Sequence, residues 1–185
     1  MRFIGLFSLF LYCVNAFNPG MQPGVSAPFG FFDPLGFSKN KDAIEFKKLQ
    51  ESEIKHSRVA MLGSVGLIVQ NYFHPLFNDE VIGDPIYHYQ IVSAKYPWLT
   101  SGILGVIALI EIANIKKGWE MKSITDGIAD LKEDYVPGDL GFDPLGLVKV
   151  PGDFEMMRTK ELNNGRLAMI ACLVYVVQHY INTSS

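Results

Sequence analysis

One charged motif occurs twice in this chain, each time at the start of an apolar stretch. The first copy reads E-I-K-H-S-R-V-A-M-L-G at residues 53–63, and the second reads E-L-N-N-G-R-L-A-M-I-A at residues 161–171. The apolar stretches themselves, Val59–Phe73 and Leu167–Ile181, are shorter than the roughly 20 residues of a typical membrane span. Both helices must therefore extend backwards through the charged motif, and charges that approach hydrocarbon need partners.

A third apolar run, Trp98–Ile115, carries a single carboxylate, Glu111. The 49% hydrophobic content and the mean hydropathy of +0.17 are high for a soluble domain of 185 residues. Basic residues gather before the first run and after the second, whereas the connection between these runs is acidic. This asymmetry predicts an all-α membrane protein with three transmembrane helices, at about residues 52–73, 98–116 and 159–181. A soluble three-helix bundle is the alternative.

The two copies of the motif keep the same register, so that Glu53 matches Glu161 and Arg58 matches Arg166. Such a duplication predicts that the first and third helices cross as a pseudo-two-fold pair. Glu53 would then meet Arg166, and Glu161 would meet Arg58. A guanidinium suits this role because it stays charged and leaves a carboxylate lone pair free. The alternative is that both ion pairs serve the structure alone.

Further oxygen and nitrogen donors follow the same two helices: His56, Asn164, Gln70 and Gln178. A Glu-x-x-His pair also occurs in di-iron carboxylate bundles, which makes an oxidase the rival interpretation. That site is incomplete here because the second copy reads Glu161-x-x-Asn164. Magnesium prefers oxygen donors, and one already held in a flat macrocycle needs a single axial ligand. Single donors scattered along apolar helices favour magnesium macrocycles over a di-iron centre.

A second repeated element precedes each copy of the motif. It reads F-D-P-L-G-F at residues 32–37 and F-D-P-L-G-L at residues 142–147. Proline fixes its own φ and biases the preceding residue away from helix. Each element therefore predicts a tight turn in a loop before a helix.

The first 16 residues have the pattern of a cleavable targeting signal, with Arg2, an apolar core and the small residue Ala16. The mature domain would then span residues 17–185, and a retained anchor helix is the alternative. A net charge of -3, without Lys/Arg clusters among aromatics, argues against a nucleic-acid partner. The two cysteines, Cys13 and Cys172, suggest neither a disulfide nor a thiolate metal site.

The two helix motifs and the stretch G-D-L-G-F-D-P-L-G-L together resemble the light-harvesting complex family, whose members bind chlorophyll a with chlorophyll b or c. The red-lineage branch is the most similar, namely fucoxanthin chlorophyll a/c-binding proteins of the photosystem I antenna type. The resemblance covers residues 29–181 in order, and the combination of two helix motifs is highly specific.

The resemblance implies the roles of particular residues. Axial ligands to chlorophyll magnesium would be Glu53, His56, Glu161, Asn164 and Gln178. Gln70 and Glu111 would be further chlorophyll ligands, Arg58 and Arg166 would complete the ligating ion pairs, and Asp33 and Asp143 would anchor the end groups of two carotenoids. For Glu111 the alternative is a structural pair with the nearby Lys116.

The resemblance also implies that the chain is an antenna and not an enzyme, and that it is a multi-pass protein of the plastid thylakoid membrane with three spans. It would bind chlorophyll a, often chlorophyll c, and xanthophyll carotenoids. Its partners would be a photosystem core, with photosystem I favoured, neighbouring antenna proteins and thylakoid lipid. A photoprotective member that dissipates excitation is the alternative within the family, although Asp79, Glu80 and Asp84 form no obvious pH sensor.

Overall fold

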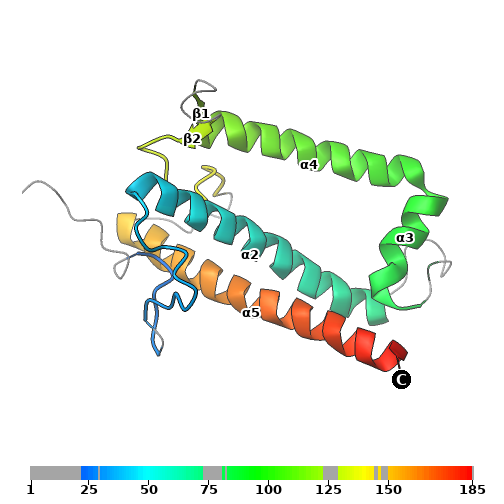
Figure 1. Cartoon of the computed structure of the whole chain (residues 1–185). Helices are drawn as coiled ribbons and strands as arrows, with labels where there is room; N and C mark the ends of the chain where they lie inside the picture. Colours follow the sequence, from blue (N-terminus) through cyan, green and yellow to red (C-terminus); the bar gives the residue numbers. More distant parts are fainter. Residues whose placement is uncertain are drawn as a thin grey trace, which may run out of the picture.

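The computed structural model describes residues 22–28, 30–72, 81, 83–122, 129–143, 146 and 150–184. The predicted targeting segment, residues 1–16, lies outside this range. The described part of the chain is mostly helical, with α2 (Ala43–Tyr72), α3 (Pro85–Lys95), α4 (Pro97–Gly118) and α5 (Pro151–Ser184) (Figure 1). Two short strands, β1 (Trp119–Met121) and β2 (Ala129–Leu131), form an antiparallel pair in which Trp119 lies opposite Leu131.

The two longest helices, α2 with 30 residues and α5 with 34, continue without a break through their charged motifs. This confirms the prediction that both helices extend backwards from the apolar stretches. At about 1.5 Å per residue, each is long enough to cross a hydrocarbon layer about 30 Å thick. The two helices lie side by side and run in the same direction (Figure 1). Ile54 and Leu162 are fully buried, with 0% and 1% of their surface exposed.

The backbones of α2 and α5 approach each other closely at Ser57 and Gly165. A Cβ atom added to Gly165 would lie 2.2 Å from the Cβ of Ser57 and 2.9 Å from its Cα. No side chain fits at such distances, so only glycine allows this approach. Small residues serve the same purpose between packed membrane helices.

Helix α4 is apolar on nearly all sides and mostly exposed. It is 22 residues long, it contains an 18-residue stretch with a mean hydropathy of 1.8, and its buried residues are Thr100 and Gly118. By length and composition, α4 is the one helix in the described part of the chain that meets the criteria for a membrane span. It runs in the direction opposite to α2 and α5 (Figure 1).

Helix α3 was not expected, because the connection between the first two apolar runs reads as a polar loop. Asp84 caps the helix by accepting a hydrogen bond from the Ile86 amide at 3.2 Å, and Pro85 occupies the first helical position. The other oxygen of Asp84 pairs with His179 Nδ1 of α5 at 2.6 Å. Asp84 therefore both starts α3 and attaches it to the last helix.

The segment after α4 adds two short paired strands, β1 and β2, to the helical architecture that the sequence predicts. Asp130 on β2 forms ion pairs with Lys122 and with Lys48 of α2. Hydrogen bonds from these two ammonium groups lower the pKa of Asp130 to about 2. The strands thus carry a charge cluster that attaches the end of α4 to the first turns of α2.

Candidate functional site

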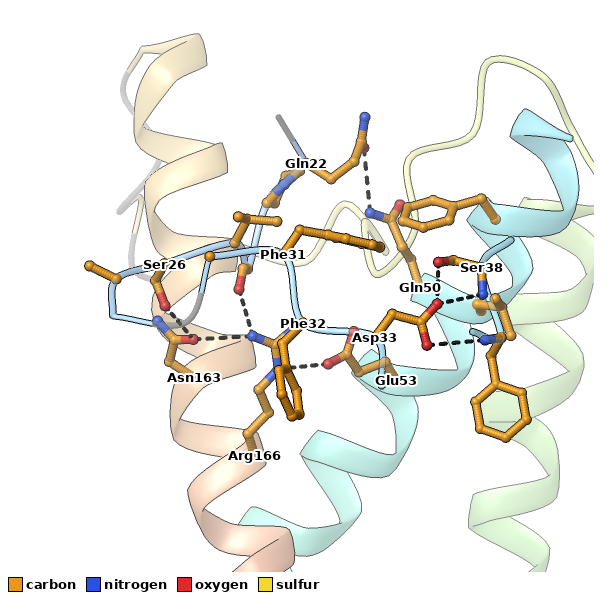
Figure 2. Close-up of a pocket in the computed structure, with 18 of the residues that line it drawn as sticks. Gln22, Ser26, Phe31, Phe32, Asp33, Ser38, Gln50, Glu53, Asn163 and Arg166 are labelled. Atoms are coloured by element: carbon orange, nitrogen blue, oxygen red, sulfur yellow. Dashed lines mark hydrogen bonds and ion pairs between the residues drawn. The ribbon is translucent and has the colours of Figure 1, made fainter. Parts of the chain in front are cut away.

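Two reciprocal ion pairs join α2 and α5. Arg166 Nε lies 2.7 Å from Glu53 Oε1 (Figure 2). Arg58 Nε lies 2.6 Å from Glu161 Oε1. These are the pairs that the sequence repeat predicts, and the prediction is confirmed. All four side chains are between 30% and 42% exposed. The carboxylates therefore remain accessible to a ligand approaching from the side of the helix pair.

Each arginine of these pairs also binds a glycine of a distant loop. Arg58 Nη2 donates to the Gly138 carbonyl at 2.9 Å, and Arg166 Nη1 donates to the Gly24 carbonyl at 2.5 Å. Gly24 has φ +90° and Gly138 has φ +83°, values that favour glycine. The loop before α2 thus binds α5, and the loop before α5 binds α2.

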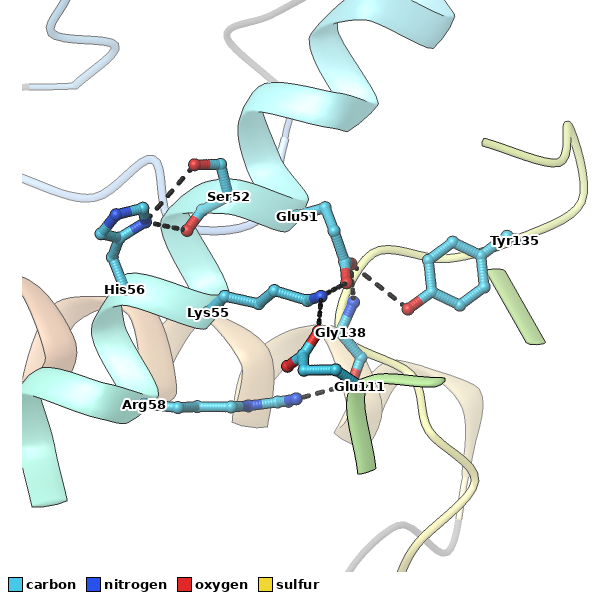
Figure 3. A network of polar contacts seen from close by, with 8 residues as sticks. All are labelled: Glu51, Ser52, Lys55, His56, Arg58, Glu111, Tyr135 and Gly138. Atoms are coloured by element: carbon cyan, nitrogen blue, oxygen red, sulfur yellow. Dashed lines mark hydrogen bonds and ion pairs between the residues drawn. The ribbon is translucent and has the colours of Figure 1, made fainter. Parts of the chain in front are cut away.

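The backbone N–H groups of the same two glycines also donate hydrogen bonds to side chains of the helices. Gly24 N donates to Thr159 Oγ1 at 3.2 Å, and Gly138 N donates to Glu51 Oε2 at 2.9 Å (Figure 3). Glu51 is only 4% exposed and also accepts a hydrogen bond from the Tyr135 hydroxyl at 3.2 Å. Sequence reasoning missed these anchors, although a Pro-Gly dipeptide ahead of each F-D-P-L-G element marks both loops.

The loop before α2 and the two long helices enclose a first groove (Figure 2). Asp33 lies at this groove and accepts hydrogen bonds from the Ser38 hydroxyl, from Ser38 N at 2.8 Å and from Phe37 N at 3.0 Å. The bonds from Ser38 lower the pKa of the Asp33 carboxyl. The Gly36 amide donates to the Asp33 carbonyl at 3.3 Å, which closes the predicted turn. The aromatic wall consists of Phe31, Phe32, Phe37 and Phe46.

A second groove lies beside the loop before α5. Its wall runs from Pro137 to Asp143, and its floor is formed by the Arg58–Glu161 pair with Phe154, Met157 and Arg158. The Gly146 amide donates to the Asp143 carbonyl at 3.2 Å, the same bond that closes the first turn. Asp33 and Asp143 therefore take matching places, one at each groove.

His56 is exposed on α2, and its ring is fixed by the preceding turn. Nδ1 lies 2.8 Å from the Ser52 carbonyl oxygen (Figure 3). A carbonyl oxygen only accepts hydrogen bonds, so Nδ1 carries a proton, and in the neutral ring Nε2 presents its lone pair. An apolar groove lies next to this ring and is lined by Lys55, His56, Val59, Ala60, Gly63, Met169 and Cys172. The geometry suits a single axial donor beside an apolar ligand.

The remaining donors predicted from the sequence lie apart from the ion pairs. Gln70, Asn164 and Gln178 are exposed along α2 and α5. Glu111 of α4 pairs with Lys55 of α2 at 2.6 Å (Figure 3), so the alternative partner, Lys116, is wrong. Lys55 Nζ also lies 4.0 Å from Glu51 Oε1. A lysine that sequence reasoning did not select therefore joins the carboxylate on α4 to α2.

Metal-binding side chains do not gather into a cage in the described part of the chain. No group of three or more His, Cys, Asp or Glu side chains is placed to hold a metal ion there. A carboxylate-bridged di-iron site requires such a cluster. The arrangement instead offers separate single donors, each beside apolar surface.

Comparison with known proteins gives one consistent family. The sequence model described as chlorophyll A-B binding protein matches residues 18–180. A fucoxanthin-chlorophyll a-c binding protein of Isochrysis galbana is 45% identical over 163 residues, which cover 86% of this chain and 76% of that protein. A light-harvesting complex stress-related protein 3.2 of Chlamydomonas reinhardtii is 44% identical over 166 residues, which cover 86% of this chain and 62% of that protein. A chlorophyll a-b binding protein 1B-21 of Hordeum vulgare is 34% identical over 162 residues, which cover 86% of this chain and 61% of that protein.

Proposed function

The chain belongs to the chlorophyll a-b binding protein family, and from this premise we propose that it is a light-harvesting antenna that passes excitation energy to a photosystem. It is not an enzyme, since the proteins of this family and the similar relatives bind pigments. The di-iron oxidase alternative is therefore set aside. The proposed cofactors are chlorophyll a, chlorophyll c and xanthophyll carotenoids, in line with the names of the algal relatives.

Chlorophyll would supply the absorption of visible light and a magnesium ion that takes a ligand from the protein. The donor chemistry of the described residues fits this ion. His56 Nε2 presents a lone pair, and Glu53 and Glu161 are carboxylates whose charges are compensated by arginines of the opposite helix. The further proposed ligands are Asn164, Gln178, Gln70 and Glu111. Oxygen donors are those that magnesium prefers, and apolar helix faces would solvate the macrocycles.

The observation that carries the proposal is the reciprocal pairing of Glu53 with Arg166 and of Glu161 with Arg58. An unpaired carboxylate in a membrane costs at least ~2.5–3.5 kcal/mol near the centre. A carboxylate that is paired on one side and half-exposed on the other is suited to a neutral pigment with a metal centre. Two such sites, related by the duplication, would hold two chlorophylls at fixed distance and orientation.

The two grooves are the proposed carotenoid sites. Each combines an aspartate-containing turn, Asp33 or Asp143, with apolar side chains on the flanks of α2 and α5. The polar end group of a xanthophyll would bind at the turn, and its polyene chain would follow the helices. Carotenoids held in this way would lie beside the chlorophylls that they supply with excitation.

We place the chain in the plastid thylakoid membrane, with α2, α4 and α5 as three spans and with α2 and α5 as the crossed pair. The exposed faces of all three helices are rich in leucine, isoleucine and valine, as lipid contact requires. The proposed partners are a photosystem core, with photosystem I favoured, and neighbouring antenna proteins.

Purification of the full chain, followed by pigment extraction and fluorescence excitation spectroscopy, tests the proposal. Chlorophyll and xanthophyll should co-purify with the protein, and light absorbed by the xanthophyll should produce chlorophyll fluorescence. A purified, folded protein without chlorophyll would overturn the antenna function.

A photoprotective role is the second candidate, and the 44% identity to a stress-related light-harvesting protein favours it. The chlorophyll fluorescence lifetime separates the two roles. A dissipating protein should show a short lifetime that shortens further when the pH falls from about 7.5 to about 5. A long lifetime at both pH values supports an antenna that only harvests light.

A further inference from the structure

The two grooves are held by equivalent residues of opposite helices. In the first, Gly24 is bound by Thr159 and Arg166 of α5 and packs against Leu162. In the second, Gly138 is bound by Glu51 and Arg58 of α2 and packs against Ile54. The arginines match each other in the duplicated motif, and so do the two buried aliphatic side chains.

One position breaks this equivalence. The residue that accepts the hydrogen bond from the glycine N–H is Glu51 at the second groove and Thr159 at the first. Glu51 is buried and accepts from both Gly138 N and the Tyr135 hydroxyl, whereas Thr159 accepts from Gly24 N at the longer distance of 3.2 Å. A hydrogen bond to a carboxylate is roughly twice as strong as one between neutral groups. The wall of the second groove is therefore fixed more firmly than the wall of the first.

We infer that Glu51 and Thr159 are positioning residues for the two carotenoid sites, each acting on one groove alone. Neither side chain ligates chlorophyll in this assignment, which rests on the proposed function. Glu51 fixes the wall from Pro137 to Asp143, and Thr159 fixes the wall that begins at Gly24. Each side chain acts on its groove through the loop that lines the groove, because Glu51 binds the Gly138 amide and Thr159 binds the Gly24 amide.

The electrostatic surroundings of Glu51 add to its hold on the second groove. Its Oε1 faces Lys55 at 4.0 Å, and Lys55 in turn pairs with Glu111 of α4 at 2.6 Å (Figure 3). At the position that matches Lys55 the second half carries Asn163, which accepts from Ser26 at 3.4 Å. The second groove is thus connected by charge to the middle helix, whereas the matching position at the first groove is neutral.

The test is refolding of the full chain with chlorophyll and a xanthophyll mixture, followed by absorption spectroscopy of the purified complex. Glu51→Leu should lower the carotenoid-to-chlorophyll ratio, and Thr159→Val should lower it less. Glu51→Gln should lower the ratio less than Glu51→Leu, because its amide oxygen still accepts both hydrogen bonds, although as a neutral and weaker acceptor. A ratio as low in Glu51→Gln as in Glu51→Leu would show that the hydrogen bonds to the loop do not determine carotenoid binding, and that result would overturn the positioning role.

Two glycine variants identify the groove that each change empties. An added Cβ would lie 2.8 Å from Ile54 Cδ1 in Gly138→Ala and 2.7 Å from Leu162 Cδ1 in Gly24→Ala. The absorption band lost in Glu51→Leu should match the band lost in Gly138→Ala. The band lost in Thr159→Val should match that of Gly24→Ala. Loss of one common band in all four variants would overturn the assignment.

Tyr135→Phe keeps the test decisive if Glu51→Leu does not refold. It removes one of the two bonds to the Glu51 carboxylate and should cause a smaller loss in the band assigned to the second groove. Unchanged carotenoid-to-chlorophyll ratios in both Tyr135→Phe and Thr159→Val would overturn the inference. An unmodified chain that refolds without any chlorophyll would instead contradict the proposed function.

Discussion

Arg58 holds the Glu161 carboxylate through two donors, Nε at 2.6 Å from Oε1 and Nη2 at 3.3 Å from Oε2. The same Nη2 also donates to the Gly138 carbonyl. The guanidinium of Arg58 on α2 therefore joins this helix to α5 and to the loop before α5. Lysine cannot replace it, because an ammonium lacks the planar fork that reaches three acceptors in fixed directions.

The crossed pairing predicts which second change rescues a broken pair. Arg166→Leu leaves Glu53 without its partner, at a cost between the ~1 kcal/mol of an exposed pair and the ~3–5 kcal/mol of a buried one. Glu53→Gln in the same chain removes the uncompensated charge and should restore pigment assembly in part. Glu161→Gln combined with Arg166→Leu should not, because Glu161 pairs with Arg58. Equal recovery in both double variants, measured as the yield of pigmented protein, would contradict the pairing.

The ring orientation of His56 predicts a specific pigment loss. His56→Leu removes the Nε2 lone pair but leaves the exposed helix surface apolar, so it should remove one discrete chlorophyll while α2 still forms. Asn164→Leu at the matching position should remove a different chlorophyll. The chlorophyll-to-protein ratio and the difference absorption spectra of the two variants check this. Unchanged ratios in both variants would show that neither residue is a ligand.

The contact between Ser57 and Gly165 predicts a compensating exchange. Gly165→Ala places a Cβ 2.2 Å from the Ser57 Cβ and should destabilise the helix pair by ~1–3 kcal/mol, the usual cost of overpacking. Adding Ser57→Gly to that variant removes the clashes with Cβ and Oγ but leaves the new Cβ 2.9 Å from the Cα of residue 57, so it should recover part of the loss. Thermal unfolding followed by the visible circular dichroism of the pigments measures the effect. A melting temperature of the double variant as low as that of Gly165→Ala would contradict the contact.

The Lys55–Glu111 pair predicts an effect on the middle helix. Lys55→Met leaves the Glu111 carboxylate uncompensated and should remove the chlorophyll proposed for that site, as should Glu111→Leu. Lys48→Met is the matched control, since Lys48 also lies on α2 but pairs with Asp130 of β2. The control should keep its full chlorophyll content. Pigment analysis in which both lysine variants lose the same amount would contradict the assignment.

The charge cluster on β2 predicts a strand pair that is insensitive to mild acid. Lys122 and Lys48 lower the pKa of Asp130 to about 2, so its stabilising contribution is complete above the ordinary value of 3.8 and disappears as the pH falls through about 2. Amide hydrogen exchange at residues 119–121 and 129–131 should show the same protection factors at pH about 7 and about 5. Lys122→Met raises this pKa toward 3.8 and brings the loss to higher pH. Protection that falls in the unmodified chain near pH 5 would contradict the cluster.

The duplicated motif allowed the sequence to predict the two ion pairs and the backward extension of α2 and α5, because a repeat constrains both partners at once. Turns at both F-D-P-L-G elements also followed from proline geometry. The partner of Glu111 did not, because nearness in sequence favoured Lys116 while the packing of α4 brings Lys55 to it. The role of Glu51 could not be predicted either, for a similar reason. Its partners, Tyr135 and Gly138, lie more than 80 residues away, and a buried carboxylate has no local sequence signature.

The binding of each loop to the opposite helix has a consequence for the order of events during synthesis. When the ribosome has completed α2 and α4, Glu53 still lacks Arg166, Arg58 still lacks Glu161, and the Gly24 loop has no surface on which to close. These contacts become available only after the last helix has emerged from the ribosome. The two ion pairs and the closure of the Gly24 loop are therefore among the last contacts of the fold to form, and the pigment sites proposed beside them can be completed only after α5 has been synthesised.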